Sequence, residues 1–175
     1  GSDVFPSISR FNDLVFGEAG VYEIFRGRVD INVIELATSE LTPVWQQDNI
    51  TVTAMGVPHG DVPTLGYRIK VGDSSIGFTS DQTGSNPIFV DFIRGVDSLV
   101  IHMAANENAT GFIADLHATP SVWGQMAEAA NVGQVVVSHI SSSDPDQLQE
   151  NLQILADNYS GDILVAEDMM CVDLP

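Results

Sequence analysis

The chain has 175 residues, of which six are Lys or Arg and 24 are Asp or Glu, so its formal net charge is −18. We expect no nucleic-acid partner, because a surface this acidic repels phosphate backbones. No apolar run approaches the roughly 18 residues that suggest a bilayer-crossing helix, so we expect no membrane partner and a soluble protein, in the cytoplasm or, as a bacterial protein, periplasmic or secreted. The lone Cys171 excludes an internal disulfide and a cysteine-rich zinc motif. A metal site would therefore use His and carboxylate ligands.

The first part of the chain combines a helical pattern with the start of a sheet. Aromatic residues recur at loosely helical spacing between glycines, which predicts a helical lead-in over residues 1–30. Runs rich in β-branched and aromatic residues then predict strands over 31–37, 50–57, 65–71 and 74–80. The stretch "VGDSS" at 71–75 is typical of a hairpin turn.

Helices and strands alternate after Asp81. Polar-Pro openings and apolar stripes predict helices over 86–95, 119–133 and 144–161. Apolar runs predict strands over 97–105, 134–140, 162–168 and 169–174. Antiparallel strands followed by βαβα units predict an α/β fold, in which a mixed β-sheet carries at least three helices. We expect a single domain over 1–175, with the sheet and helices in residues 31–175.

Three of the residues best suited to bind a metal follow or end a predicted strand. His59, Asp81 and His139 each come at the carboxyl end of such a run, and His117 lies in the loop before a helix. Because loops at the carboxyl ends of strands form the ligand crevice of an open α/β sheet, these side chains are expected to meet at one edge. Imidazole and carboxylate donors with an open position for water suit a hydrolytic metal. Taken singly, each histidine is better explained as an ordinary loop residue, and it is the joint pattern that favours a metal site.

Other readings of the polar residues are weaker. His102 lies inside the run "LVIHMAA", which predicts a hydrogen-bonded core histidine, with support of a neighbouring ligand as the alternative. Ser138 and Ser141 flank His139, so a serine nucleophile can be imagined, but no GxSxG motif accompanies them. The glycines of "HGDVPTLG" lack the spacing and the lysine of a phosphate-binding loop.

Five stretches together resemble the metallo-β-lactamase superfamily: "VPHGDVPTLGYRI", "GFTSDQTG", "LVIHMAA", "LHATPSVWGQMAEAANVGQVVVSHI" and "YSGDILVAEDMM". They cover about residues 50 to 170 in the family's order. The sequence is most similar to the branch that contains tRNA-maturing endonucleases, phosphodiesterases and arylsulfatases. The resemblance implies one half of an αββα sandwich and a hydrolase that acts on a small ester, sulfate ester, phosphodiester or lactone. Metal-bound hydroxide would be the nucleophile.

The resemblance also implies roles for four residues. His59 would bind one metal, Asp81 would bridge two metals, and His139 would bind the second. His117 would be catalytic, as a proton donor or electrostatic partner in the transition state. The implied cofactor is a divalent metal, two zinc ions in the first instance, with manganese or iron as alternatives.

Two departures from the family pattern limit what the resemblance implies. Met103 stands where the endonucleases carry a glutamate, which argues against tRNA as the substrate. The HxHxDH motif that supplies the remaining metal ligands is missing, so the chain resembles only the C-terminal half of such enzymes, and we expect it alone to be inactive and to bind metal weakly. The missing half or a second copy of the chain is then the expected partner. A non-catalytic structural or interaction half-domain is the alternative.

Overall fold

A computed structural model describes residues 41–175, and everything below concerns that part of the chain. The helical lead-in expected over 1–30 and the strand expected over 31–37 lie outside the described residues. Among the helices described, none combines the length and the apolar character that a bilayer crossing requires.

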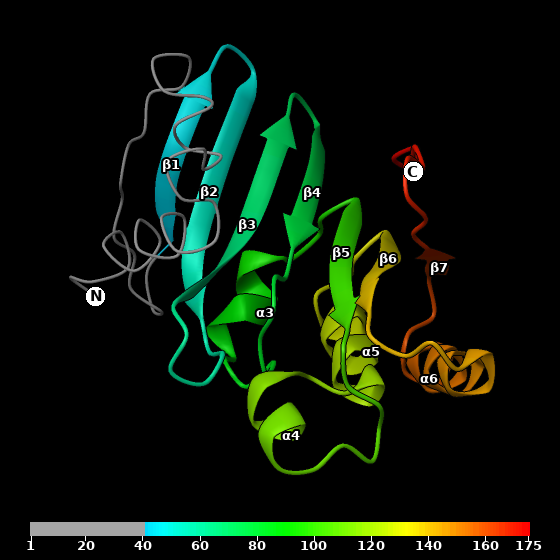
Figure 1. The fold of residues 1–175 in the computed structure, drawn as a ribbon. Coiled ribbons are helices and arrows are strands. Elements are labelled where there is room, and N and C mark those ends of the chain that lie inside the picture. Colours follow the sequence, from blue (N-terminus) through cyan, green and yellow to red (C-terminus); the bar gives the residue numbers. More distant parts are fainter. Residues whose placement is uncertain (1–40) are drawn as a thin grey trace, which may run out of the picture. The chain divides into compact units, whose positions relative to one another are not determined.

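One mixed sheet organises the described residues (Figure 1). Its seven strands lie side by side in chain order: β1 (Thr42–Gln47), β2 (Ile50–Val57), β3 (Thr64–Val71), β4 (Ser74–Phe78), β5 (Ser98–Met103), β6 (Gln134–Ile140) and β7 (Asp162–Val165). The pairings from β1 to β4 are antiparallel, and those from β4 to β7 are parallel. The predicted α/β fold with a mixed sheet is therefore confirmed.

The direction of the strands decides where their ends meet. β2 and β4 are both antiparallel to β3, so they run the same way as each other, and β5 and β6 are parallel to β4. The carboxyl ends of these four strands consequently lie at one edge of the sheet.

Four helices are described: α3 (Ile88–Phe92), α4 (Phe112–Leu116), α5 (Pro120–Ala129) and α6 (Pro145–Asn158). The prolines at the first positions of α5 and α6 match the predicted openings, and the Asp144 carboxylate accepts the N–H of Asp146 as a cap. Thr119 occupies the cap position of α5 but makes no capping bond. The short α4 was not predicted.

The expected strand over 169–174 is wrong. Within the described residues the sheet ends with β7, and the following segment contains a turn. Met169 there is 98% exposed and has a φ of +68°, a left-handed backbone that is incompatible with an extended strand. The strand-like composition of "MMCVDL" therefore has no neighbouring strand to pair with. By contrast, the turn predicted at 71–75 forms, with Gly72 at a φ of +61°.

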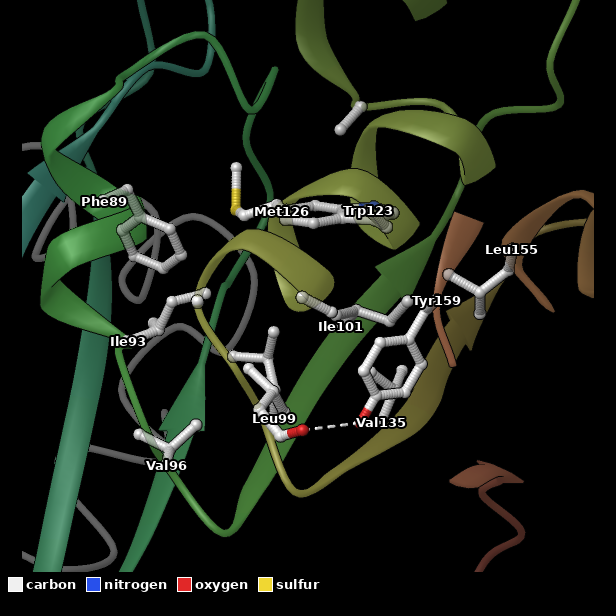
Figure 2. Close-up of a cluster of buried hydrophobic side chains, with 14 of the residues drawn as sticks. Phe89, Ile93, Val96, Leu99, Ile101, Trp123, Met126, Val135, Leu155 and Tyr159 are labelled. Atoms are coloured by element: carbon white, nitrogen blue, oxygen red, sulfur yellow. Dashed lines mark hydrogen bonds between the residues drawn. The ribbon is translucent and has the colours of Figure 1, made fainter. Parts of the chain in front are cut away.

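The core lies between one face of the sheet and the helices (Figure 2). Alternate residues of β5 and β6 face the helices, since successive side chains of a strand point to opposite faces. Phe89 of α3 and Ile93, the residue that caps α3, lie on one side of this cluster and Leu155 of α6 lies on the other, with Trp123 of α5 between them. The cluster also contains Met55, Val57, Phe92, Val96, Leu99, Ile101, Met103, Ala118, Met126, Ala127, Ala130, Val132, Val135, Val137 and Tyr159. Burial of these residues fixes the sheet against its helices and so fixes its edge.

The helices α5 and α6 approach each other closely at Gly124. A Cβ atom at this position would lie 2.6 Å from the Asn158 Cβ and 2.8 Å from the Leu155 carbonyl oxygen. Contacts this short require the two helices to move apart, because one of the neighbouring atoms belongs to the backbone.

We therefore predict that Gly124→Ala destabilises the protein, although Gly to Ala inside a helix normally stabilises by about 0.5–1 kcal/mol. Overpacking should lower the free energy of unfolding by about 1–3 kcal/mol. Urea denaturation followed by circular dichroism measures it. The matched control is Gln149→Ala on the exposed face of α6, which should change stability by less than about 0.5 kcal/mol. An increase in stability of Gly124→Ala would contradict the helix contact described here.

Candidate metal centre

Five potential ligands gather where the four strand ends meet. His59 follows β2, Asp81 follows β4, His102 is the penultimate residue of β5, and His139 is the penultimate residue of β6. His117 follows α4 and precedes α5. The structure thus brings together all four side chains that the sequence singled out, and it adds His102.

Asp81 lies in a loop that is held on both sides by backbone hydrogen bonds. Thr83 donates its N–H to the carbonyl of Pro58, next to His59, at 2.9 Å. On the other side, Ala118 donates its N–H to the carbonyl of Gln82 at 2.8 Å. The loop after β4 therefore fixes the spacing between the loop that carries His59 and the loop that carries His117.

The residue before Asp81 has an unusual backbone conformation. Ser80 has a φ of +51°, in the left-handed region that residues other than glycine adopt rarely and at a cost of about 1–3 kcal/mol. Such strain concentrates at functional sites because the surrounding structure has to maintain it. Here it aims the Ser80 carbonyl and the Asp81 side chain toward the two neighbouring strands.

His139 lies at an irregularity in the parallel ladder. His102 pairs with Ser138 and Met103 with Ile140, so His139 has no partner in the register and forms a bulge, with a φ of +44°. Its Nδ1 lies 2.8 Å from the Asp81 Oδ1, and the His139 side chain is 54% exposed. His139 and Asp81 are thus in direct contact, on the open side of the cluster.

His59 is oriented by a backbone carbonyl. Its Nδ1 lies 2.9 Å from the carbonyl oxygen of Leu116, and because a carbonyl only accepts, Nδ1 must carry the proton. The lone pair of His59 is then on Nε2. Its ring centroid lies 5.1 Å from that of His117. Fixing one ring nitrogen in this way is how proteins orient metal-binding histidines.

His102 is held in the same way but is more deeply buried. Its Nδ1 donates to the carbonyl of Ser80 at 2.7 Å, and only 3% of the residue is exposed. Its Nε2 is buried and has no hydrogen-bond partner among the described residues. The ring lies 5.1 Å from His117 and 4.9 Å, edge to face, from Trp123. The expectation of a hydrogen-bonded core histidine is met, yet this histidine is also at the centre of the cluster.

Burial keeps two of the imidazoles neutral. Desolvation lowers the pKa of His102 from 6.5 to about 4, and the nearby Asp81 carboxylate opposes this only in part. Desolvation also lowers the pKa of His117, again against the influence of Asp81. Neutral imidazole is the form that binds metal, so no proton has to be removed from either ring near neutral pH.

The most compact group of donor atoms is not the one expected. The ligand atoms of Asp81, His102 and His117 all lie within 4.8 Å of one another, and His59 and His139 flank this group through contacts with His117 and Asp81. The Nδ1 of His117 is buried and, like the Nε2 of His102, has no partner among residues 41–175. One carboxylate and several imidazoles suit zinc and similar transition metals, so the donor set fits such an ion.

The two serines beside His139 are engaged elsewhere. Ser138 donates its hydroxyl to the carbonyl of Ile101, and Ser141 donates to the carbonyl of Ala104, both at 2.8 Å. Neither hydroxyl is bonded to a histidine, which is what activates a serine nucleophile.

Comparison of the sequence with protein-family models gives no match, and comparison with curated protein sequences also gives none. Solved structures do resemble the chain. The metallo-β-lactamase fold protein YhfI from Bacillus subtilis matches 95% of this chain and 69% of its own, with a TM-score of 0.65 and 17% identity. The short form of human tRNase Z matches 77% of this chain and 46% of its own, with a TM-score of 0.59 and 18% identity.

A third match is a metal-bound protein. Zn²⁺-bound PqqB from Methylobacterium extorquens matches 81% of this chain and 51% of its own, with a TM-score of 0.55 and 17% identity. The chain thus spans about half the length of the human and Methylobacterium proteins. At identities of 17–18%, these matches are evidence for the fold and not for the activity. Together with the mixed sheet and the strand-end cluster, these matches show that the chain has the metallo-β-lactamase fold.

Proposed function

We propose that this chain carries part of the active site of a metal-dependent hydrolase. The observation that supports the proposal is the meeting of Asp81 with four histidines at one edge of the sheet. In the proposed site His59, Asp81 and His139 would hold the metal, with Asp81 shared between two ions if two are bound. Zinc is the first choice of metal because histidine and carboxylate donors suit it, with manganese or iron as alternatives.

The chain's own residues would orient the ligands and the substrate. When bound, the metal would lower the pKa of a coordinated water toward about 7 and so supply the nucleophile. The Leu116 carbonyl keeps His59 in the tautomer whose Nε2 is free to bind. His139, which contacts Asp81, has a side chain that is 54% exposed, so a substrate could approach the cluster from the side of His139.

His117 is the proposed proton donor to the leaving group. It lies between α4 and α5, and its ring stands 5.1 Å from His59 and 6.2 Å from His139. His117 thus lies beside both histidines that would hold the metal, which is where a leaving group would need a proton. General acid catalysis of this kind contributes about 10²–10⁴-fold in rate.

The proposed substrates are small esters, sulfate esters, phosphodiesters and lactones. The net charge of −18 disfavours long polyanions such as tRNA, although human tRNase Z shares the fold. Three protein ligands from this chain do not complete two metal sites, so the remaining ligands are proposed to come from a longer form of the protein or from a partner chain. If no activity appears in any such form, the non-catalytic half-domain becomes the better account.

For the complete natural protein loaded with zinc or manganese, we predict hydrolysis of a chromogenic phosphodiester or ester. His117→Ala should lower kcat by about 10²–10⁴-fold because the proton donor is lost. The matched control is Asp115→Ala, an exposed residue of α4 two positions away, which should retain the original kcat. Equal kcat values for His117→Ala and the unaltered protein would remove His117 from the mechanism.

We further predict that a fluorophosphonate probe does not label the protein. The hydroxyls of Ser138 and Ser141 are hydrogen-bonded to backbone carbonyls and have no histidine to activate them. Mass spectrometry after incubation with the probe measures this, with a known serine hydrolase as the positive control. A stoichiometric adduct on either serine would favour a serine hydrolase instead.

A further inference from the structure

The described residues carry exposed apolar side chains on the segments that hold His59 and His117. Phe112 and Ile113, the first two residues of α4, are 74% and 41% exposed, and Val62, in the loop after β2, is 56% exposed. We call these three side chains the apolar rim. No residue of α4 is buried, so the core does not account for the apolar character of this helix. Apolar side chains left in water next to a polar cluster are typical of a ligand site.

The helix α4 connects the apolar rim to the cluster. The carbonyl of Leu116, the last residue of α4, accepts the Nδ1 proton of His59 at 2.9 Å. Phe112 lies four residues before Leu116, so the two share one face of the helix. Ile113 accepts the N–H of His117 at its carbonyl, also at 2.9 Å. Each of the two exposed residues is therefore one helical turn away from a position at the cluster.

Val62 reaches the same place from the loop after β2. Its N–H donates to the carbonyl of His59 at 3.0 Å. A Cβ atom at Gly60 in this loop would lie 2.7 Å from the Leu116 Cδ2, so the loop packs directly on α4 (Figure 1). The apolar rim therefore borders the cluster with side chains from two segments.

The segment that carries α4 is anchored at both ends. The carboxylate of Glu107 accepts the N–H of Ser121 at 3.0 Å and also its hydroxyl, which joins the segment to the first turn of α5. Leu116 joins the other end to His59. A surface that is already in position loses less conformational entropy on binding than a mobile one, so the apolar rim suits recognition of a ligand.

The loops at this edge of the sheet contain no basic residue. The segments that follow β2, β4, β5 and β6 are residues 58–63, 79–87, 104–119 and 141–144. They hold five Asp or Glu residues and no Lys or Arg. Proteins bind sulfate and phosphate groups chiefly with Arg and Lys. The described side chains at this edge therefore offer an anionic substrate no opposite charge.

We propose that the site takes an uncharged ester or lactone with an apolar group, and that Phe112 is the main contact of that group. This inference rests on the proposed hydrolase and narrows its substrates, because it sets aside sulfate esters and phosphodiesters. The carbonyl group of the substrate faces the cluster, and the apolar group lies against the apolar rim. Hydrolysis consumes one water, breaks the bond between the carbonyl carbon and the alcohol oxygen, and yields an alcohol, a carboxylate and one proton.

The first test measures binding without catalysis. The 175-residue chain, freed of metal by a chelator, is titrated by calorimetry with two probes of similar length. Methyl hexyl ketone is an uncharged ester analogue that water does not cleave, and octanesulfonate is an anion. We expect the ketone to bind about tenfold more tightly than the sulfonate, and Phe112→Ser to weaken ketone binding by about threefold to tenfold.

The matched control is Val71→Ser. Val71 is also exposed, at 46%, but it pairs with Ile50 at the opposite end of β2 and β3, so its replacement should leave ketone binding unchanged. Ketone binding that is equal in Phe112→Ser and in the unaltered chain would overturn the inference, as would tighter binding of the sulfonate. A dimer in sedimentation that Phe112→Ser dissociates would assign the apolar rim to a second copy of the chain instead.

The second test uses the metal-loaded complete protein. The ratio of kcat/KM for p-nitrophenyl hexanoate to that for p-nitrophenyl acetate measures recognition of the apolar group. Phe112→Ser should lower this ratio by about threefold to tenfold, and Val71→Ser should not change it. Faster hydrolysis of a phosphodiester or sulfate ester than of either neutral ester would overturn this inference and leave the proposed hydrolase standing. No hydrolysis of any substrate would count against the hydrolase, and the binding test would still decide whether the apolar rim takes an uncharged ligand.

Discussion

The cluster depends on a single corner of the chain, Ser80–Asp81, at the end of β4. The carbonyl of Ser80 orients His102 on β5, and the carboxylate of Asp81 contacts His139 on β6. Two consecutive residues thus position histidines from two further strands. The left-handed backbone of Ser80 turns its carbonyl toward His102 and the next side chain toward His139. Backbone hydrogen bonds to the loops on both sides hold this corner in place.

The cluster also combines a buried inner part with an exposed outer part. His102 lies against Trp123 of the core, where desolvation depresses its basicity, whereas His139 is half exposed. Burial thus disfavours the charged form of His102 and lowers its pKa.

Much of this arrangement follows from the sequence. The strands β5 and β6 are recognisable because they are apolar runs that the fold buries. The start of α6 is recognisable because Asp144 caps the helix and Pro145 has the fixed φ of a first helical residue. The positions of His59 and Asp81 directly after strands were enough to predict that they lie at one edge. The likeness of the fold to metallo-β-lactamase proteins could be recognised from five short motifs, although the overall identity to the solved structures is below 20%.

What the sequence did not reveal depends on contacts between distant segments. His102 looks like a core residue because its strand is almost wholly apolar, and only the hydrogen bond to Ser80 shows which of its nitrogens is left free. One signal was present, since His102 is near the carboxyl end of its strand like the other candidates. The short α4 has too few residues for a recognisable periodicity, and the strand expected at 169–174 had the right composition but no neighbour to pair with.

The bulge at His139 also determines which side chains of β6 point toward the helices and which point away. Val135 and Val137 face the helices, so uninterrupted alternation would turn position 139 into the same apolar layer. The additional residue moves the phase by one, and Ile140 packs against the core in place of the histidine. The bulge therefore places the imidazole of His139 at the exposed edge of the sheet and not in the apolar core. Deleting one residue at the bulge would restore the regular alternation and exchange the positions of the His139 and Ile140 side chains.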